Sequence, residues 1–162
     1  SGLMVNCSTC PRGKYSLSGQ LGCISCRAGA FAMNPGSDAC TECAAGSYQN
    51  LNGQTSCVAC SSGQSQGRTG ESACDECEPG KYASQVGSVS CSECAAGFSA
   101  VVAKATDCTA CTTGKYQFRT GQSYCIECDS AKYAPVVGSV ACDTCKAGFY
   151  SESGSESCGL AC

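Results

Sequence analysis

Pairs of cysteines are the residues of this chain whose type and spacing could carry chemistry. The chain has 20 cysteines among 162 residues. C-x-x-C pairs recur every 16 or 17 residues, and a final pair, Cys158 and Cys162, has one extra residue between its cysteines. The regular pairs begin at Cys7, Cys23, Cys40, Cys57, Cys74, Cys91, Cys108, Cys125 and Cys142. Such pairs could bind zinc through thiolates, act as redox dithiols or form disulfide bonds.

The composition favours disulfide bonds over the other two chemistries. Two pairs at this spacing could make a four-thiolate zinc site, but such zinc modules usually carry basic residues, and this chain has 10 basic against 13 acidic residues. Redox dithiols lie singly at helix N-termini, whereas these pairs recur in a sequence without helical periodicity. Leu, Ile, Val and Phe total only 20 residues, so covalent bridges must replace an apolar core. We predict a small disulfide-rich protein of an oxidising compartment, extracellular or at the cell surface.

Charge and hydropathy exclude several partners and activities. The net charge is -3 without a run of like charges, so we expect neither nucleic acid nor an anionic membrane as partner. No apolar run approaches the roughly 20 residues of a membrane span, and the chain lacks a signal peptide, as expected of a mature product or a piece of a longer protein. There is no histidine, and the acidic residues are scattered rather than paired. We predict no catalytic residue, no cofactor and no metal, although a calcium-binding row of acids remains an alternative.

Two glycine positions and one aromatic position recur between the cysteine pairs. The first-glycine position is the third residue after each second cysteine: Gly13, Gly29, Gly46, Gly63, Gly80, Gly97, Gly114 and Gly148, with Ala131 as the exception. An aromatic follows two places later at Tyr15, Phe31, Tyr48, Tyr82, Tyr116, Tyr133 and Tyr150, while Phe98 lies one place early and Ser65 breaks the pattern. The second-glycine position lies four residues before the next pair: Gly19, Gly36, Gly53, Gly70, Gly87, Gly121, Gly138 and Gly154, with Lys104 as the exception.

This pattern predicts tandem short β-hairpins of about 17 residues with little or no helix. Glycines at both ends of a segment indicate backbone positions with positive φ between two short extended pieces. Because each unit contacts only its neighbours, we expect the repeats to stack into an elongated rod or solenoid. After a lead-in, 1–6, the array spans 7–162 and is expected to belong to a longer array. Its units are 10–26, 26–43, 43–60, 60–77, 77–94, 94–111, 111–128, 128–145 and 145–162.

The repeat resembles known extracellular modules. The segment from Cys10 through Gly13 and Tyr15 to Cys23 is similar to the bridged hairpin of epidermal-growth-factor-like modules and of tumour necrosis factor receptor repeats. The full pattern, from Cys7 to about Cys158, resembles the ephrin-receptor-like cysteine-rich repeat. This resemblance implies that each second cysteine bonds the first cysteine of the next pair. The implied bridges are Cys10–Cys23, Cys26–Cys40, Cys43–Cys57, Cys60–Cys74, Cys77–Cys91, Cys94–Cys108, Cys111–Cys125, Cys128–Cys142 and Cys145–Cys158.

An interlaced connectivity is the alternative to this ladder. In it Cys7 bonds Cys23 and Cys10 bonds Cys26, and repetition every two units closes all cysteines. The ladder instead leaves Cys7 and Cys162 unpaired within the chain, so that they would bond outside it. Either scheme closes loops of roughly fifteen residues, each worth about 3 kcal/mol in the chain-entropy model.

Several residue groups could form contact surfaces. Glu42, Glu76, Glu93 and Glu127 share the place before a second cysteine, and Lys14, Lys81, Lys115 and Lys132 share the place before the tyrosine; a solvated face is the interpretation we favour. Asn6 fits the N-glycosylation acceptor pattern, and serines and threonines in loops could carry O-linked glycans. The candidate contact residues are Val86, Val89, Val101, Val102, Tyr116, Phe118, Arg119, Tyr124, Val137 and Val140.

From these observations we predict an extracellular structural protein, a rod-like segment of a cell-surface stalk, coat or fibre that self-associates or contacts other extracellular proteins. The alternative is a receptor-like ectodomain that binds a protein ligand along the array. Binding arrays concentrate aromatic and arginine residues at a few repeats. The repeat that contains Tyr116, Phe118, Arg119 and Tyr124 comes nearest to that description.

Overall fold

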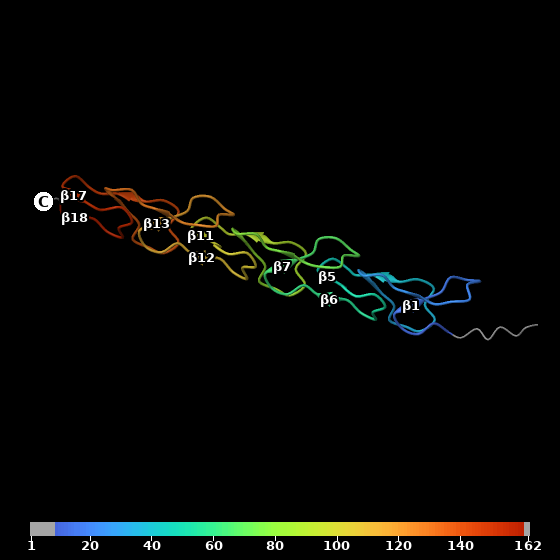
Figure 1. Ribbon diagram of the computed structural model, residues 1–162. Coiled ribbons are helices and arrows are strands. Elements are labelled where there is room, and N and C mark those ends of the chain that lie inside the picture. Colours follow the sequence, from blue (N-terminus) through green and yellow to red (C-terminus); the bar gives the residue numbers. More distant parts are fainter. Residues whose placement is uncertain (1–8, 161–162) are drawn as a thin grey trace, which may run out of the picture. The chain divides into compact units, whose positions relative to one another are not determined.

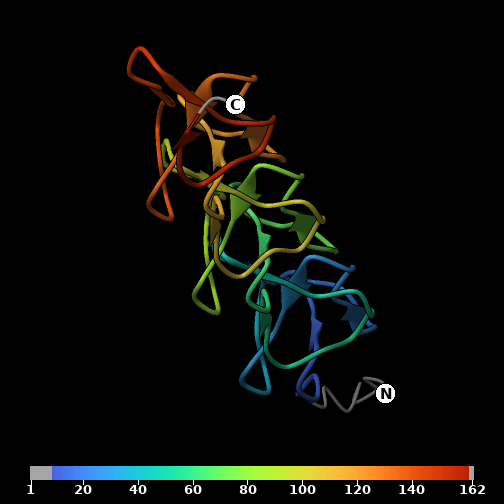
Figure 2. The ribbon, with the colours of Figure 1, turned by 90° about the vertical axis from the view of Figure 1, so that its left-hand side faces the viewer.

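The protein is a series of two-stranded antiparallel hairpins, described here from a computed structural model over residues 9–160 (Figure 1). The two strands of a hairpin lie side by side, as labelled for β11 and β12. The described residues contain no helix, and long loops separate the short strands (Figure 2). The pairs are β1 (Lys14–Tyr15) with β2 (Ile24–Ser25), β3 (Ala30–Phe31) with β4 (Thr41–Glu42), β5 (Ser47–Tyr48) with β6 (Val58–Ala59), β7 (Gln64–Ser65) with β8 (Asp75–Glu76), β9 (Lys81–Tyr82) with β10 (Ser92–Glu93), β11 (Phe98–Ser99) with β12 (Thr109–Ala110), β13 (Lys115–Tyr116) with β14 (Ile126–Glu127), β15 (Lys132–Tyr133) with β16 (Asp143–Thr144), and β17 (Phe149–Tyr150) with β18 (Gly159–Leu160).

Positive φ angles at both glycine positions shape each hairpin, which confirms the prediction from the glycine pattern. The first-glycine position turns the chain into the first strand, and the second-glycine position turns the loop back towards the next cysteine pair. The two exceptions in the sequence keep the same backbone conformation. Lys104 has φ 61° and Ala131 has φ 62°, and they are the positive-φ residues other than glycine in the described chain. The repeat therefore imposes the turn geometry at these positions, and Lys104 and Ala131 adopt it despite the steric strain of a positive φ at a residue with a Cβ.

The apolar part of the interior consists of cysteine and alanine side chains. Among the described residues, the buried apolar side chains are eight cysteines and five alanines, and all eight cysteines are the second cysteines of their pairs. The large aliphatic and aromatic side chains are half-buried or exposed. The fold therefore lacks an ordinary apolar core, as the composition predicts.

Backbone hydrogen bonds join each repeat to the next. The Gly29 N–H donates to the Gln49 carbonyl at 2.7 Å, and the Gly53 N–H donates back to the Cys26 carbonyl at 2.7 Å. The same two bonds recur further along, from Gly97 to Gln117 and from Gly121 to Cys94. Each pair of neighbours is thus held by main-chain groups at fixed positions.

A closer approach links repeats that are two apart, so the expectation that each unit contacts only its neighbours was wrong. Gly46 lies against the carbonyl of Gly87, and Gly80 lies against that of Gly121. A Cβ atom on Gly80 would lie 2.7 Å from the Gly121 carbonyl carbon and would overlap its oxygen. Glycine is required here by space as well as by φ.

The chain divides into two compact units. One consists of the described residues 9–61 with 65–75 and 86–90, and the other of 62–64, 76–85 and 91–160. Contacts between repeats two places apart occur within each unit, as between Gly46 and Gly87 in the first and between Gly80 and Gly121 in the second. In the part of the chain that the structure describes, there is no helix long and apolar enough to cross a membrane.

Candidate interaction surfaces on the disulfide-bonded hairpins

Nine disulfides close the described hairpins, each joining a second cysteine to the first cysteine of the next pair. The Cα atoms of each pair are 5.5 to 5.8 Å apart, and the sequence separation is 13 or 14. This is the ladder that the resemblance implies; in the interlaced alternative Cys10 would bond Cys26, but Cys26 bonds Cys40. Cys7, Cys162 and Asn6 lie outside the described residues. The bridges are Cys10–Cys23, Cys26–Cys40, Cys43–Cys57, Cys60–Cys74, Cys77–Cys91, Cys94–Cys108, Cys111–Cys125, Cys128–Cys142 and Cys145–Cys158.

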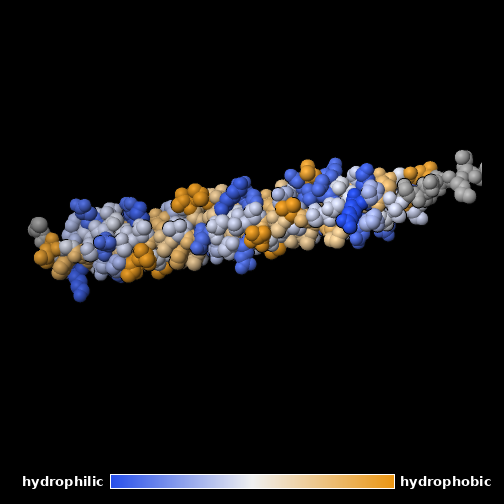
Figure 3. Space-filling view, turned by 90° about the horizontal axis from the view of Figure 1, so that it is seen from below, coloured by the Kyte–Doolittle hydropathy of each residue, from blue (hydrophilic) through white to orange (hydrophobic). Residues whose placement is uncertain are grey.

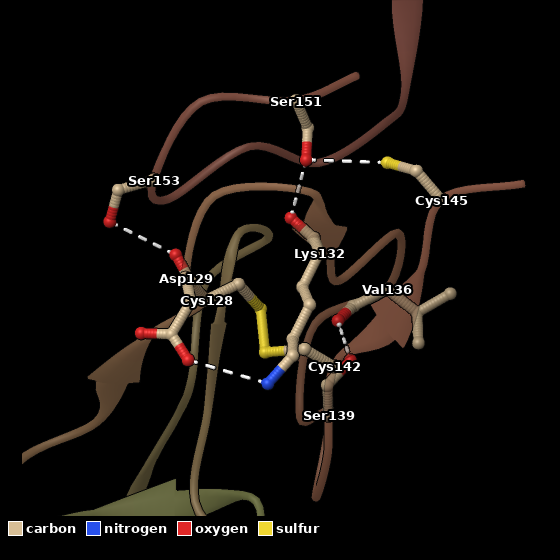
Figure 4. The surroundings of a disulfide bond; sticks show 9 residues. All are labelled: Cys128, Asp129, Lys132, Val136, Ser139, Cys142, Cys145, Ser151 and Ser153. Atoms are coloured by element: carbon tan, nitrogen blue, oxygen red, sulfur yellow. Dashed lines mark hydrogen bonds and ion pairs between the residues drawn. A yellow bond between two sulfur atoms is a disulfide. The ribbon is translucent and has the colours of Figure 1, made fainter. Parts of the chain in front are cut away.

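The surroundings of the Cys128–Cys142 bridge show how a repeat holds its neighbour (Figure 4). The Ser153 hydroxyl donates to the Cys128 carbonyl at 3.0 Å, and the Ser151 hydroxyl donates to the Lys132 carbonyl at 2.8 Å. Both serines belong to the next repeat. Side-chain hydroxyls therefore supplement the main-chain bonds around the bridge.

Shallow hollows recur beside the bridges. Tyr116 and Cys142 line a hollow of about 220 Å³, and Tyr82 and Cys108 line an equivalent one of about 240 Å³. In each case the tyrosine comes from one repeat and the cysteine from the bridge of the next. Tyr82 and Tyr116 thus lie beside a neighbouring disulfide, half-buried.

Most of the recurring charged residues form exposed ion pairs. Glu76 Oε1 accepts from Lys104 Nζ at 2.7 Å, and Glu127 Oε1 lies 3.2 Å from Lys115 Nζ. All these side chains are at least two-fifths exposed, so each pair is worth only about 0 to 1 kcal/mol. The described residues contain no cluster of three or more histidine, cysteine, aspartate or glutamate side chains that could hold a metal ion.

The candidate valines lie on hairpin loops and are exposed. Val101, at 72 %, and Val102 share one loop, and Val137 and Val140 share another in the same unit. Val86 and Val89, also exposed, belong to the first unit. On the face shown in Figure 3, apolar residues form separate small patches among hydrophilic ones.

Three buried glutamines clamp hairpin loops, a feature that the sequence reasoning missed. Gln117, 2 % exposed, donates from Nε2 to the Tyr124 carbonyl at 2.8 Å, and its Oε1 accepts from the Arg119 N–H at 3.1 Å. Gln49 and Gln66 make the same two bonds. The sequence feature that could have indicated these clamps is a glutamine at the sixth place after the second cysteine in these three repeats. Alanine or serine occupies that place in the other repeats.

The loop clamped by Gln117 presents the aromatic cluster that the sequence singles out. The rings of Tyr116 and Phe118 stack with centroids 6.3 Å apart, and the Arg119 guanidinium carbon lies 5.0 Å from the Phe118 centroid. Phe118 is 54 % and Tyr124 61 % exposed. The structure therefore brings Tyr116, Phe118 and Arg119 together on one loop.

Tandem hairpins, each closed by one bridge, define a small disulfide-rich repeat protein. Residues 29–72 and 66–107 match the family described as tyrosine-protein kinase ephrin type A/B receptor-like. Hairpins and bridges of the same kind continue on both sides of these segments, although the sequence separation is 13 in the first and last bridges and 14 in the others. The chain is therefore an array of ephrin-receptor-like cysteine-rich repeats. A search of curated proteins found no match.

The family defines the general character of the chain. It is a receptor-like, disulfide-rich extracellular module. Such modules take part in interactions between extracellular proteins. The particular role of this array, as a stalk, fibre or receptor, is a separate question.

Proposed function

We propose that this chain is a structural segment of an extracellular protein, a rod-like part of a cell-surface stalk, coat or fibre. One observation carries the proposal: bridges and main-chain hydrogen bonds hold the described repeats, and the interior contains only cysteine and alanine as buried apolar residues. Such an assembly derives its strength from covalent closure and can be lengthened by adding repeats. Exposed valines on the loops, and sugars on Asn6 or on loop hydroxyls, would mediate self-association or contact with other extracellular proteins.

Stretching the chain from its two ends tests the structural role. Fully extended, 162 residues span about 550 Å. Each described bridge joins cysteines 13 or 14 positions apart in the sequence and keeps the segment between them from extending, so we expect the oxidised chain to extend to less than half of this length. The reduced chain should reach nearly the full length at low force. An oxidised chain that extends as far as the reduced one would contradict the proposal.

Electron microscopy of the oxidised chain tests the assembly. We expect extended particles or fibres. Sedimentation of the same sample measures whether the particles associate. A short, monomeric particle that binds a soluble partner would refute the structural role and support the receptor-like alternative. The aromatic loop of the 111–128 repeat is the observation that favours that alternative.

A further inference from the structure

We infer that the loop of residues 116–124, here called the aromatic loop, binds an acidic segment of another protein. The inference concerns one hairpin and does not depend on the structural role proposed above. It rests on the comparison of this hairpin with another repeat of the same chain.

The repeats 60–77 and 111–128 share one loop framework. Gln66 and Gln117 make equivalent bonds to the loop. The loops also share a threonine, Thr69 or Thr120, whose hydroxyl donates to the carboxylate of Glu42 or Glu93 at 3.3 or 3.1 Å. The two loops therefore have matched scaffolds, and their differences lie in the side chains they display.

Four loop positions differ, and each difference adds an aromatic group or removes a carboxylate. Ser65, Gly67 and Ala73 correspond to Tyr116, Phe118 and Tyr124. Glu71 corresponds to Gln122.

The loss of that carboxylate frees an arginine. Arg68 Nε lies 3.1 Å from Glu71 Oε1. Arg119 occupies the equivalent place, but within the described chain no carboxylate lies at ion-pair distance from it. Glu93 reaches the loop at Thr120 instead. The Arg119 guanidinium lies over the Phe118 ring, and this leaves its N–H groups able to bind a carboxylate through two parallel hydrogen bonds.

The aromatic loop is also ordered before any partner binds. Gln117 is buried, and its side chain is hydrogen-bonded to the backbone N–H of Arg119 and to the backbone carbonyl of Tyr124. A loop fixed in advance loses less conformational entropy on binding. Exposed aromatic rings beside an arginine are the residues that dominate protein–protein interfaces.

The charges select an acidic protein segment over a polyanion. Binding of nucleic acid or a sulfated polysaccharide depends on neutralising several charges at once. Lys115, the other cation of this hairpin's strands, is paired with Glu127, so Arg119 acts alone. The surface suits one carboxylate next to an apolar side chain, as in an extended segment where glutamate and leucine alternate.

The test is a titration of the oxidised chain with a fluorescein-labelled peptide of alternating glutamate and leucine, followed by fluorescence anisotropy. We expect saturable binding that weakens at high salt. Gln122→Glu restores the carboxylate found in the 60–77 repeat and should weaken binding at least fivefold; Arg119→Gln and Phe118→Ala should each weaken it at least tenfold. Arg68→Gln, the matched control, should change it less than twofold. Hydrogen exchange of each variant verifies that the hairpin remains folded.

Several results would overturn the inference. One is the absence of saturable binding when the peptide reaches millimolar concentration. Another is equal affinity for a peptide with glutamine in place of glutamate. A third is an equal loss of affinity from Arg68→Gln and from Arg119→Gln. Binding of a heparin oligosaccharide without binding of the peptide would identify a polyanion site instead. Self-association that Gln122→Glu abolishes, without peptide binding, would identify a second copy as the occupant.

Discussion

At the scale of single residues, space and backbone conformation constrain the first-glycine positions separately. Gly80 and Gly148 have the same φ of 87°. A Cβ on Gly80 would overlap the Gly121 carbonyl, whereas a Cβ on Gly148 would meet nothing within 4 Å. The two positions therefore separate the cost of positive φ from the cost of the close approach.

We expect Gly80→Ala to destabilise its repeat by roughly 2 to 5 kcal/mol, because the methyl group adds overpacking to backbone strain. Gly148→Ala should cost only about 1 to 2 kcal/mol, since it incurs the strain alone. Hydrogen exchange at the amides of each repeat measures both losses relative to the unsubstituted chain. Equal losses at the two sites would contradict the role of the inter-repeat contact.

The sequence predicts the glycine conformations better than it predicts the loop contacts. Glycines at fixed places imply positive φ through the sterics of a single residue. The clamp by Gln117 could not be inferred in this way, because a glutamine in a loop is usually solvated and its burial depends on the shape of the loop. The contact of Gly80 with Gly121 likewise joins residues 41 apart, and nothing in the local pattern indicates it.

At the scale of the hairpin, each described sheet has two strands of only two residues. An isolated hairpin of this kind would be marginal in water. Its stability must come from closure of the loop and from bonds to neighbouring repeats, such as those from Ala100 to Gln122 and from Gly121 to Cys94.

Removal of one bridge by replacing Cys94 and Cys108 with serine should cost about 3 kcal/mol. Because neighbouring repeats keep their own bridges, we expect faster hydrogen exchange mainly in 94–111 and in the repeats directly bonded to it. The distant 26–43 hairpin serves as the internal control. Uniform loss of protection throughout the chain would show instead that the array unfolds as one cooperative unit.

Hairpin boundaries follow closely from the sequence, whereas the disulfide partners of the cysteines do not. The cysteine and glycine positions place each strand to within a residue or two. The cysteine positions alone leave the ladder and the interlaced connectivity open; a family resemblance favours the ladder, and the structure contains it.

At the scale of the whole molecule, the absence of buried large apolar residues from the described chain makes folding dependent on oxidation. We expect reduction in the absence of denaturant to unfold all described hairpins, since cysteine and alanine are the only buried apolar residues of the described chain. Amide proton chemical-shift dispersion should collapse on reduction and return on reoxidation. Retention of native dispersion by the fully reduced, alkylated chain would show that main-chain bonds suffice.

The backbone nature of the contacts between repeats has a consequence for variation. Glycine N–H groups, glycine carbonyls and cysteine carbonyls make the recurring contacts, while the loop side chains beyond the sixth place after the second cysteine largely face solvent. Loop sequences can therefore be exchanged between repeats without altering the framework, as the contrast between 60–77 and 111–128 already illustrates. Such an array can acquire or lose a recognition site by substitutions within one loop, much as an antibody domain changes specificity in its loops.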